Sequence, residues 1–265
     1  MQKVSLSLLI ILFSTTAGCK STTPQEHTSL AISPDKDPGP PKKKLSMVWQ
    51  HHSTGDNLLA GGLLAALKKN NIDFYDINYK EADVGGYVIG DHTDPKDFPK
   101  NFNTPKYLDA IKSWELKGEK KQHDIVMFKS CYPSSKIESD AMLEQYKKWY
   151  LSMLPTFKAH PDVLFIGMSS PPLVQKETTP AIAKRARAWA KWVSGEYAKD
   201  AKNVQVFDLF NAMAVLEGKP GENMLVPQFA VDKWDSHPTP AAAKAVTRMF
   251  IPWFNRALRA AGFGG

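Results

Sequence analysis

The chain has 265 residues, a formal net charge of +7 and 43% hydrophobic residues. It shows neither a basic stripe interleaved with aromatic residues nor a zinc-finger spacing, so the sequence argues against a nucleic-acid partner. Its only two cysteines, Cys19 and Cys131, are too few and too far apart for a Cys-x-x-Cys zinc site.

Residues 1–18 are predicted to be a signal peptide and not part of the fold. Lys3 supplies a positive start, residues 4–13 form an apolar run, and Thr16-Ala17-Gly18 offers small residues for cleavage. The apolar run is too short for an ordinary transmembrane helix. The segment therefore predicts export.

Cys19 directly follows Ala17-Gly18 and resembles a bacterial lipoprotein cleavage site, in which the cysteine is lipidated and becomes the mature N-terminus. Thr16 stands where that pattern usually has leucine, so an ordinary secretory peptide is the alternative. Lys20 after the cysteine resembles the pattern for delivery to the outer membrane. A lipid anchor in the bacterial cell envelope is the expected location.

Residues 19–44 are predicted to be a disordered tether, because serine, threonine, proline, aspartate and lysine dominate them. Its three final lysines, residues 42–44, either touch anionic lipid headgroups or are simply solvated. The remaining stretch, residues 45–265, has about the length of one domain with a single core.

Apolar runs typical of strands recur along this domain, at 45–49, 72–79, 124–128, 162–167 and 204–207. Helical patterns lie between and after them, at 57–69, 105–116, 139–150, 180–197 and 240–260. Alternating strands and helices at this spacing predict an α/β fold. We expect a three-layer α/β/α sandwich around a mostly parallel, flavodoxin-like sheet of five strands.

Two segments carry candidate catalytic residues. Ser53 follows the first predicted strand and precedes a helix, which places it at the carboxyl edge of the sheet, where ligand sites form in α/β proteins. Near the C-terminus, Asp235 and His237 lie two residues apart on a proline-bounded loop. Serine is a weak nucleophile until a base takes its proton, and a carboxylate must orient that base. Asp235 is the first candidate for this acid, and Asp232 is the second.

Simpler interpretations of these residues stay open. Ser53 alone could be a helix cap, and His237 alone could be a loop histidine packed beside Pro238. The adjacent pair His51-His52 lacks the helical spacing of a zinc hydrolase, because neighbouring side chains on a strand point to opposite faces. No metal and no cofactor are therefore predicted.

The order of these motifs resembles the SGNH, or GDSL-type, hydrolase superfamily from Leu45 onward. That family has its serine after the first strand and its aspartate and histidine on one late loop before the last helix. Here His51-His52-Ser53-Thr54-Gly55 replaces Gly-Asp-Ser, and Asp-x-His replaces Asp-x-x-His. The sequence Lys129-Ser130-Cys131 stands where the family has Gly-x-Asn-Asp. These motifs resemble a divergent branch of the superfamily.

The resemblance also implies an oxyanion hole, the set of donors that stabilises negative charge on the reacting carbonyl oxygen. Its donors would be the amides of Ser53 and Gly86, with Ser130 or Ser134 in place of the missing asparagine. Cys131 aligns with that asparagine, and a thiol is a poor donor. A buried, packed cysteine is preferred here over a redox-sensitive thiol.

The activity that the resemblance implies is hydrolysis of an acyl ester through Ser53, with an O-acetylated glycan as the favoured substrate and a small ester as the alternative. Two other functions remain open. One is a catalytically silent carbohydrate-binding lipoprotein of the same fold, since the asparagine block is missing. The other is acyl transfer to a sugar hydroxyl instead of to water, which the same three residues permit.

Overall fold

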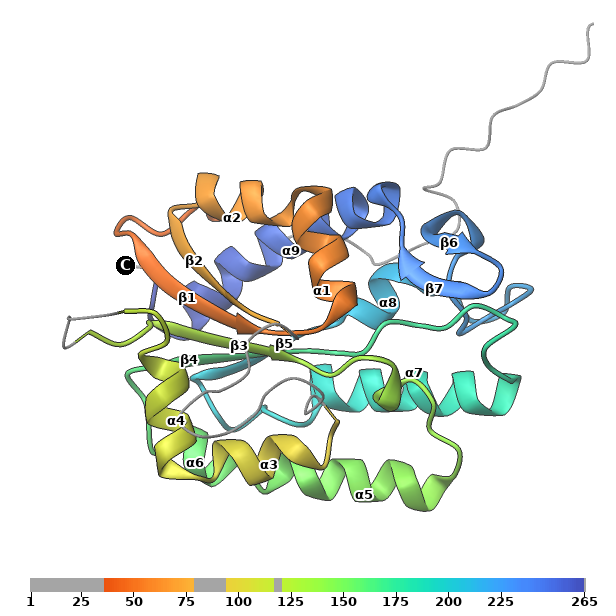
Figure 1. Ribbon diagram of the computed structural model, residues 1–265, viewed down its shortest axis with the longest axis horizontal. Coiled ribbons are helices and arrows are strands. Elements are labelled where there is room, and N and C mark those ends of the chain that lie inside the picture. Colours follow the sequence, from red (N-terminus) through yellow and green to blue (C-terminus); the bar gives the residue numbers. More distant parts are fainter. Residues whose placement is uncertain (1–35, 79–93, 117–120, 265) are drawn as a thin grey trace, which may run out of the picture.

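The computed structural model describes residues 36–78, 94–116 and 121–264 (Figure 1). Its centre is a five-stranded sheet in the order β2-β1-β3-β4-β5, and every neighbouring pair is parallel. The strands are β1 (Leu45–Gln50), β2 (Ile72–Ile77), β3 (Ile125–Lys129), β4 (Leu164–Met168) and β5 (Val204–Phe207). All five lie within a few residues of the predicted runs.

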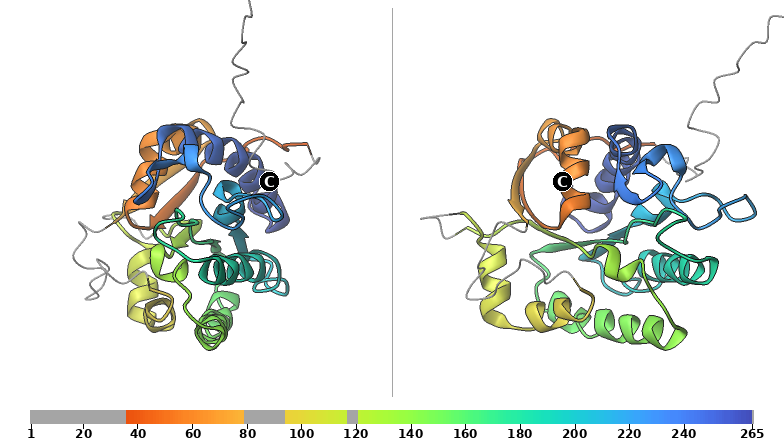
Figure 2. Two further views of the ribbon diagram at one scale, coloured as in Figure 1. Left: turned by 90° about the vertical axis from the view of Figure 1, so that its right-hand side faces the viewer. Right: turned by 45° about the vertical axis from the view of Figure 1, so that its right-hand side comes forward.

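Helices cover both faces of the sheet, which confirms the predicted three-layer sandwich (Figures 1 and 2). One face carries α1 (Ser53–Leu58), the π-helical turn η2 (Leu59–Leu63), α2 (Leu64–Lys69) and α9 (Pro240–Ala260). The other carries α3 (Asp97–Phe102), α4 (Pro105–Lys112), α5 (Asp140–Leu151), α6 (Leu154–Lys158) and α7 (Pro180–Gly195). A short helix, α8 (Leu209–Met213), follows β5 and contacts both α7 and α9.

The alternation of side chains along β1 divides the core between the two faces. Met47 and Trp49 join the cluster beneath α1 and α9, whereas Val48 joins the cluster beneath α4 and α5. All six residues of the strand are buried. Because both faces of a parallel sheet are covered by helices, its central strands are apolar throughout instead of alternating with polar residues.

The first helical segment differs from the single helix predicted from Asn57. It begins four residues earlier, at Ser53, and is interrupted by the π-helical turn, within which Gly62 has a φ of 125°. Gly61 in this turn faces α9 so closely that a Cβ there would lie 2.1 Å from the Cβ of Ala243. Glycine at position 61 thus permits α9 to lie against the segment that begins with Ser53.

The segment predicted to be a loop around Asp235 is a β-hairpin. After the 3₁₀ turn η4 (Pro227–Phe229), strand β6 (Ala230–Asp232) pairs antiparallel with β7 (Asp235–Pro238). Thr239 then caps α9 by accepting the backbone N–H of Ala242 at 3.3 Å, as its position before Pro240 predicts. The C-terminal motif is therefore held at both ends by regular structure.

The packed domain begins before Leu45. Asp37 accepts a hydrogen bond from Asn255 of α9 at 2.9 Å, and the carbonyl of Pro41 accepts one from Asn71 at 3.1 Å. Residues 36–44, predicted as the end of the tether, thus contact the domain, while Cys19 and residues 19–35 lie outside the described residues. Across the residues that the structure describes, no helix combines the length and apolar character needed to span a membrane.

Candidate active site

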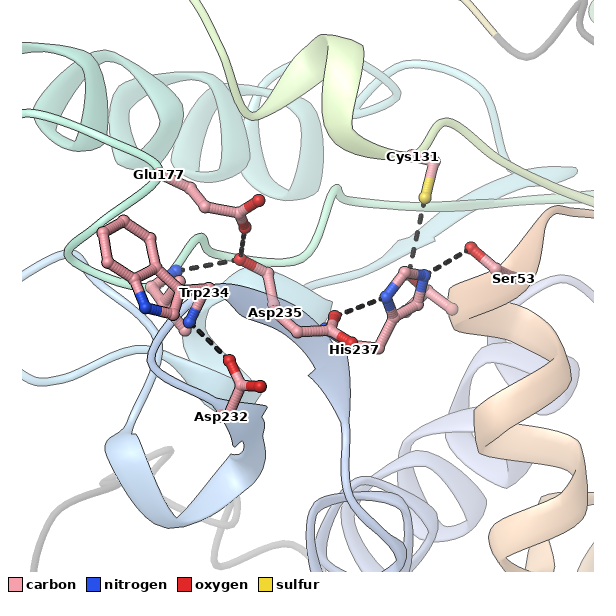
Figure 3. A network of polar contacts seen from close by, with 10 residues as sticks. Ser53, Cys131, Glu177, Asp232, Trp234, Asp235 and His237 are labelled. Atoms are coloured by element: carbon pink, nitrogen blue, oxygen red, sulfur yellow. Dashed lines mark hydrogen bonds and ion pairs between the residues drawn. The ribbon is translucent and has the colours of Figure 1, made fainter.

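Ser53 is the first residue of α1, just past the carboxyl end of β1. The N-cap position belongs to His52, whose backbone is extended and whose side chain makes no capping bond. The hydroxyl of Ser53 instead points at the imidazole of His237, with 2.8 Å between Oγ and Nε2 (Figure 3). The helix-cap interpretation of Ser53 is therefore wrong, and the structure brings together two residues 184 positions apart.

Asp235 fixes the tautomer of His237. Its Oδ1 lies 2.6 Å from Nδ1 of the ring and also accepts the backbone N–H of His237 at 2.8 Å. These hydrogen bonds, the backbone one foremost, lower the pKa of the Asp235 carboxyl below its ordinary value. Since the carboxylate can only accept, Nδ1 carries the hydrogen, and Nε2 presents its lone pair to the Ser53 hydroxyl.

Asp232, the second candidate acid, lies elsewhere on the hairpin. Its carboxylate accepts the backbone N–H of Trp234 at 2.6 Å and so stabilises the turn between β6 and β7 (Figure 3). Of the two candidate acids, Asp235 is thus the one whose carboxylate contacts His237.

The strand β7 explains how an Asp-x-His spacing can work. Alternate residues of a strand share a face, so Asp235 and His237 point the same way and Ser236 points the other way. Ser236 accepts the backbone N–H of Val174 at 3.0 Å and donates to the carboxylate of Glu177. The strand is therefore tied to the segment that follows β4, which fixes the plane from which His237 projects.

Two further residues border this site: Tyr132, which the sequence places beside the candidate loops, and Thr54, to which the sequence assigned no role. The ring of Tyr132, in the 3₁₀ turn η3 (Tyr132–Ser134), meets the His237 ring edge-on, with 5.4 Å between centroids. Thr54 Oγ1 lies 3.4 Å from the sulfur of Cys131, which is buried. The signal that could have revealed the second contact is that β1 and β3 are neighbours, so the residues after both strands meet at one sheet edge.

Of the residues predicted to supply oxyanion donors, Ser53, Ser130 and Ser134 lie among the described residues. Gly86 lies outside the described residues. Ser130 is buried, and its hydroxyl makes no hydrogen bond within the part of the chain that the structure describes. Ser134 is also buried, and its hydroxyl donates to the carbonyl of Cys131 at 3.5 Å. Among the described residues, neither the Ser130 hydroxyl nor the Ser134 hydroxyl forms a hydrogen bond with Ser53.

A second polar cluster lies under the first turn of α1. Ligand atoms of His51, Asp56 and Asp76 all lie within 4.8 Å of one another, a spacing at which such groups can hold a metal ion. However, Nε2 of His51 lies 2.6 Å from Oδ1 of Asp76, a hydrogen-bond distance between two atoms that already satisfy each other. The cluster fits an ion pair better than a metal centre.

Comparisons with known proteins support the fold. No family model and no curated protein sequence matches the chain. A GDSL-like lipase structure from Bacteroides thetaiotaomicron VPI-5482 is 17% identical, with a TM-score of 0.51 over 86% of this chain and 95% of its own. A protein described as an acylhydrolase, from Bacteroides fragilis NCTC 9343, is 15% identical, with a TM-score of 0.52 over 84% and 93%. The chain has the fold of SGNH/GDSL-type hydrolases, as its motifs predicted.

Proposed function

We propose that the protein is a serine ester hydrolase that uses Ser53 as nucleophile, His237 as base and Asp235 as the acid that orients it. The observation that carries this proposal is the continuous hydrogen-bonded chain from Ser53 Oγ through His237 to Asp235. Proteins of the same fold that are described as lipase and acylhydrolase support the reaction class.

The reaction follows from the direction of these hydrogen bonds. Ser53 Oγ attacks the ester carbonyl while Nε2 of His237 takes the hydroxyl proton, and Asp235 stabilises the imidazolium that forms. The tetrahedral intermediate collapses as His237 returns the proton to the departing alcohol, which leaves an acyl group on Ser53. Water, deprotonated by His237, then releases the carboxylic acid and restores the serine.

The proposed substrate is an acyl ester, favoured as an O-acetyl ester, on a glycan or small molecule. Trp234 supports a glycan, because its side chain is 59% exposed at the tip of the hairpin that carries Asp235. A cavity of about 650 Å³ opens beside the same hairpin and is bordered by Val174 and Val231. An exposed aromatic ring on the hairpin that carries Asp235 suits stacking against a sugar face. We propose that export and a lipid on Cys19 place the enzyme in the cell envelope.

One observation favours the silent carbohydrate-binding alternative. The resemblance to SGNH/GDSL-type hydrolases implies that Cys131 stands in place of the asparagine of the oxyanion hole, and loss of one oxyanion donor typically costs on the order of a hundredfold or more in rate. We therefore expect slow turnover. Acyl transfer to a sugar hydroxyl would use the same acyl-enzyme and differ only in the acceptor.

Labelling with a fluorophosphonate probe tests the proposal, together with turnover of p-nitrophenyl acetate. The wild type is expected to label and to turn over slowly, and Ser53→Ala and His237→Ala to do neither. Ser113→Ala, a change of an exposed serine far from the site, is the matched control and should behave as wild type. An unlabelled, inactive wild type that still binds acetylated glycans would establish the silent binder instead.

A further inference from the structure

Titratable side chains from three adjacent strands lie beneath the first turn of α1. His51 follows β1 directly, Lys129 ends β3, and Asp76 lies near the end of β2. His51 and Lys129 are fully buried, while Asp76 is 42% exposed. Asp56 of α1 faces the same layer from above. The proposed reaction assigns no role to these groups.

Both ring nitrogens of His51 face hydrogen-bond acceptors. Nδ1 lies 3.0 Å from the backbone carbonyl oxygen of His52, which has no hydrogen to offer, so Nδ1 must carry one. Nε2 lies 2.6 Å from the carboxylate of Asp76. Without a second proton, the lone pair of Nε2 would face a negative oxygen at that distance, which is repulsive. The hydrogen bonds thus require a proton on each nitrogen.

The charges around the ring agree with a positive His51. Two carboxylates, Asp56 and Asp76, lie beside it, and Asn78 donates to Asp56 at 3.2 Å. Burial lowers the pKa of Lys129, but the neighbouring Cys131 and Asp56 oppose that shift. Among the described residues, an imidazolium at His51 would lie between two carboxylates of opposite charge, Asp56 and Asp76, which is a favourable arrangement.

His51 also touches the turn that carries Ser53. The carbonyl of His52 that accepts Nδ1 also accepts the backbone N–H of Gly55 at 2.6 Å. A Cβ on Gly55 would lie only 2.3 Å from Nδ1, so the ring fills the space beside the glycine. The imidazole therefore holds the first turn of α1 both by a hydrogen bond and by contact.

We propose that His51 is a positioning residue, which acts as an imidazolium paired with Asp76 to hold the turn in the orientation that directs Ser53 Oγ at His237. This inference rests on the proposed function. It adds a fourth residue, His51, whose second proton is buried and lies outside the three catalytic residues. The carboxylate of Asp76 keeps the second proton on Nε2. The hydrogen bond from Nδ1 to the carbonyl of His52 then holds the turn on which Ser53 lies.

The variant Asp76→Asn removes the negative charge at position 76 and keeps a side chain of nearly the same size and shape. The asparagine amide can donate to a neutral Nε2, so the variant keeps a hydrogen bond while His51 loses its second proton. Asp73→Asn is the matched control, because Asp73 lies on the same strand and pairs at the surface with Lys44. We expect kcat on p-nitrophenyl acetate to fall roughly tenfold or more in Asp76→Asn, with KM unchanged, since small misplacements of reacting groups can cost up to a hundredfold.

The pH dependence gives a signature that a merely structural role would not produce. Acid can supply the proton that the carboxylate otherwise holds, so the ratio of kcat between Asp76→Asn and wild type should rise as the pH falls. Taking the ratio removes the dependence that both enzymes share through His237. A ratio independent of pH, or an unchanged kcat, would overturn the proposal.

Nitrogen-15 NMR of the histidine rings in the full-length protein tests the charge without turnover. Both nitrogens of His51 should be protonated at neutral pH in wild type and only Nδ1 in Asp76→Asn. His123 is an internal control that should stay neutral, because its Nδ1 accepts from Ser46 at 2.7 Å and burial lowers its pKa. The His237 signals should shift in Asp76→Asn and not in Asp73→Asn. An unprotonated His51 nitrogen in wild type, or unmoved His237 signals, would refute the inference even if the protein has no esterase activity.

Discussion

The carboxylate of Asp235 uses one oxygen for two hydrogen bonds, to the ring and to the backbone N–H of His237. Asp235 reaches both groups because it lies two residues before the histidine on the extended strand β7. Asp232 cannot replace it, because its own carboxylate holds the hairpin turn through Trp234.

Asp235→Asn should therefore lower kcat by about 10⁴, as loss of the orienting acid does in a serine triad, because the amide permits the wrong tautomer. Asp232→Asn should change kcat by only a few-fold. Steady-state turnover of p-nitrophenyl acetate, with circular dichroism to check the fold, distinguishes the two. The opposite ranking of the variants would assign the acid to Asp232.

The sequence singled out Ser53 between a strand and a helix, and Asp235 and His237 on a segment before the last helix; the structure places these three residues in contact. It did not predict the partners of His51 or Thr54. Those depend on which strands are neighbours, and the order in which strands lie in a sheet cannot be read from their spacing along the chain. Two adjacent histidines looked alike in sequence, yet His51 is locked beneath α1 while His52 is its N-cap.

Among the elements, the π-helical turn η2 packs closely against α9 beside the site. Gly61→Ala would place a methyl group 2.1 Å from the Cβ of Ala243, which is fully buried and cannot move aside easily. We expect the free energy of unfolding to fall by about 1–3 kcal/mol, as in other overpacked cores. Gly195→Ala, where the added Cβ meets nothing within 4 Å, is the control and should be neutral or stabilising. Urea unfolding measures both, and equal stabilities would contradict the packing.

The hairpin of β6 and β7 was predicted as a loop because its strands are only three and four residues long. Its tip presents Trp234 to solvent, with the ammonium groups of Lys176 and Lys233 5.4 and 5.8 Å from the ring. If this ring stacks against a glycan, Trp234→Ala should raise KM for an acetylated oligosaccharide several-fold and leave p-nitrophenyl acetate unaffected. An equal effect on both substrates would show that the tip supports the hairpin and does not bind sugar.

For the molecule as a whole, the apolar runs and helical periodicities predicted the layers, the parallel sheet and the final helix. The short helices α3, α6 and α8 were missed, since five or six residues show too little of a 3.6-residue period to be recognised. Residues 36–44, predicted as the end of the tether, show no apolar pattern in the sequence, and they contact the domain through hydrogen bonds such as those of Asp37 and Pro41.

Attachment is a property of the whole chain. If Cys19 carries lipid, a Gram-negative host supplied with radiolabelled palmitate should yield labelled wild-type protein in the membrane fraction. Cys19→Ala should remain unlabelled, with Cys131→Ala as the control that keeps the label. Equal label in wild type and Cys19→Ala, or fully soluble wild-type protein, would rule out the anchor and favour simple secretion.

The exposed turn at residues 218–222 separates the two halves of the candidate site along the chain. A break there would leave Ser53 on one fragment, and Asp235, His237 and α9 on the other. Neither piece would hold all three catalytic residues, and α9 on one piece would have to pack against Gly61 on the other. If the proposed reaction is correct, we expect two separately expressed pieces to gain esterase activity only after they have associated.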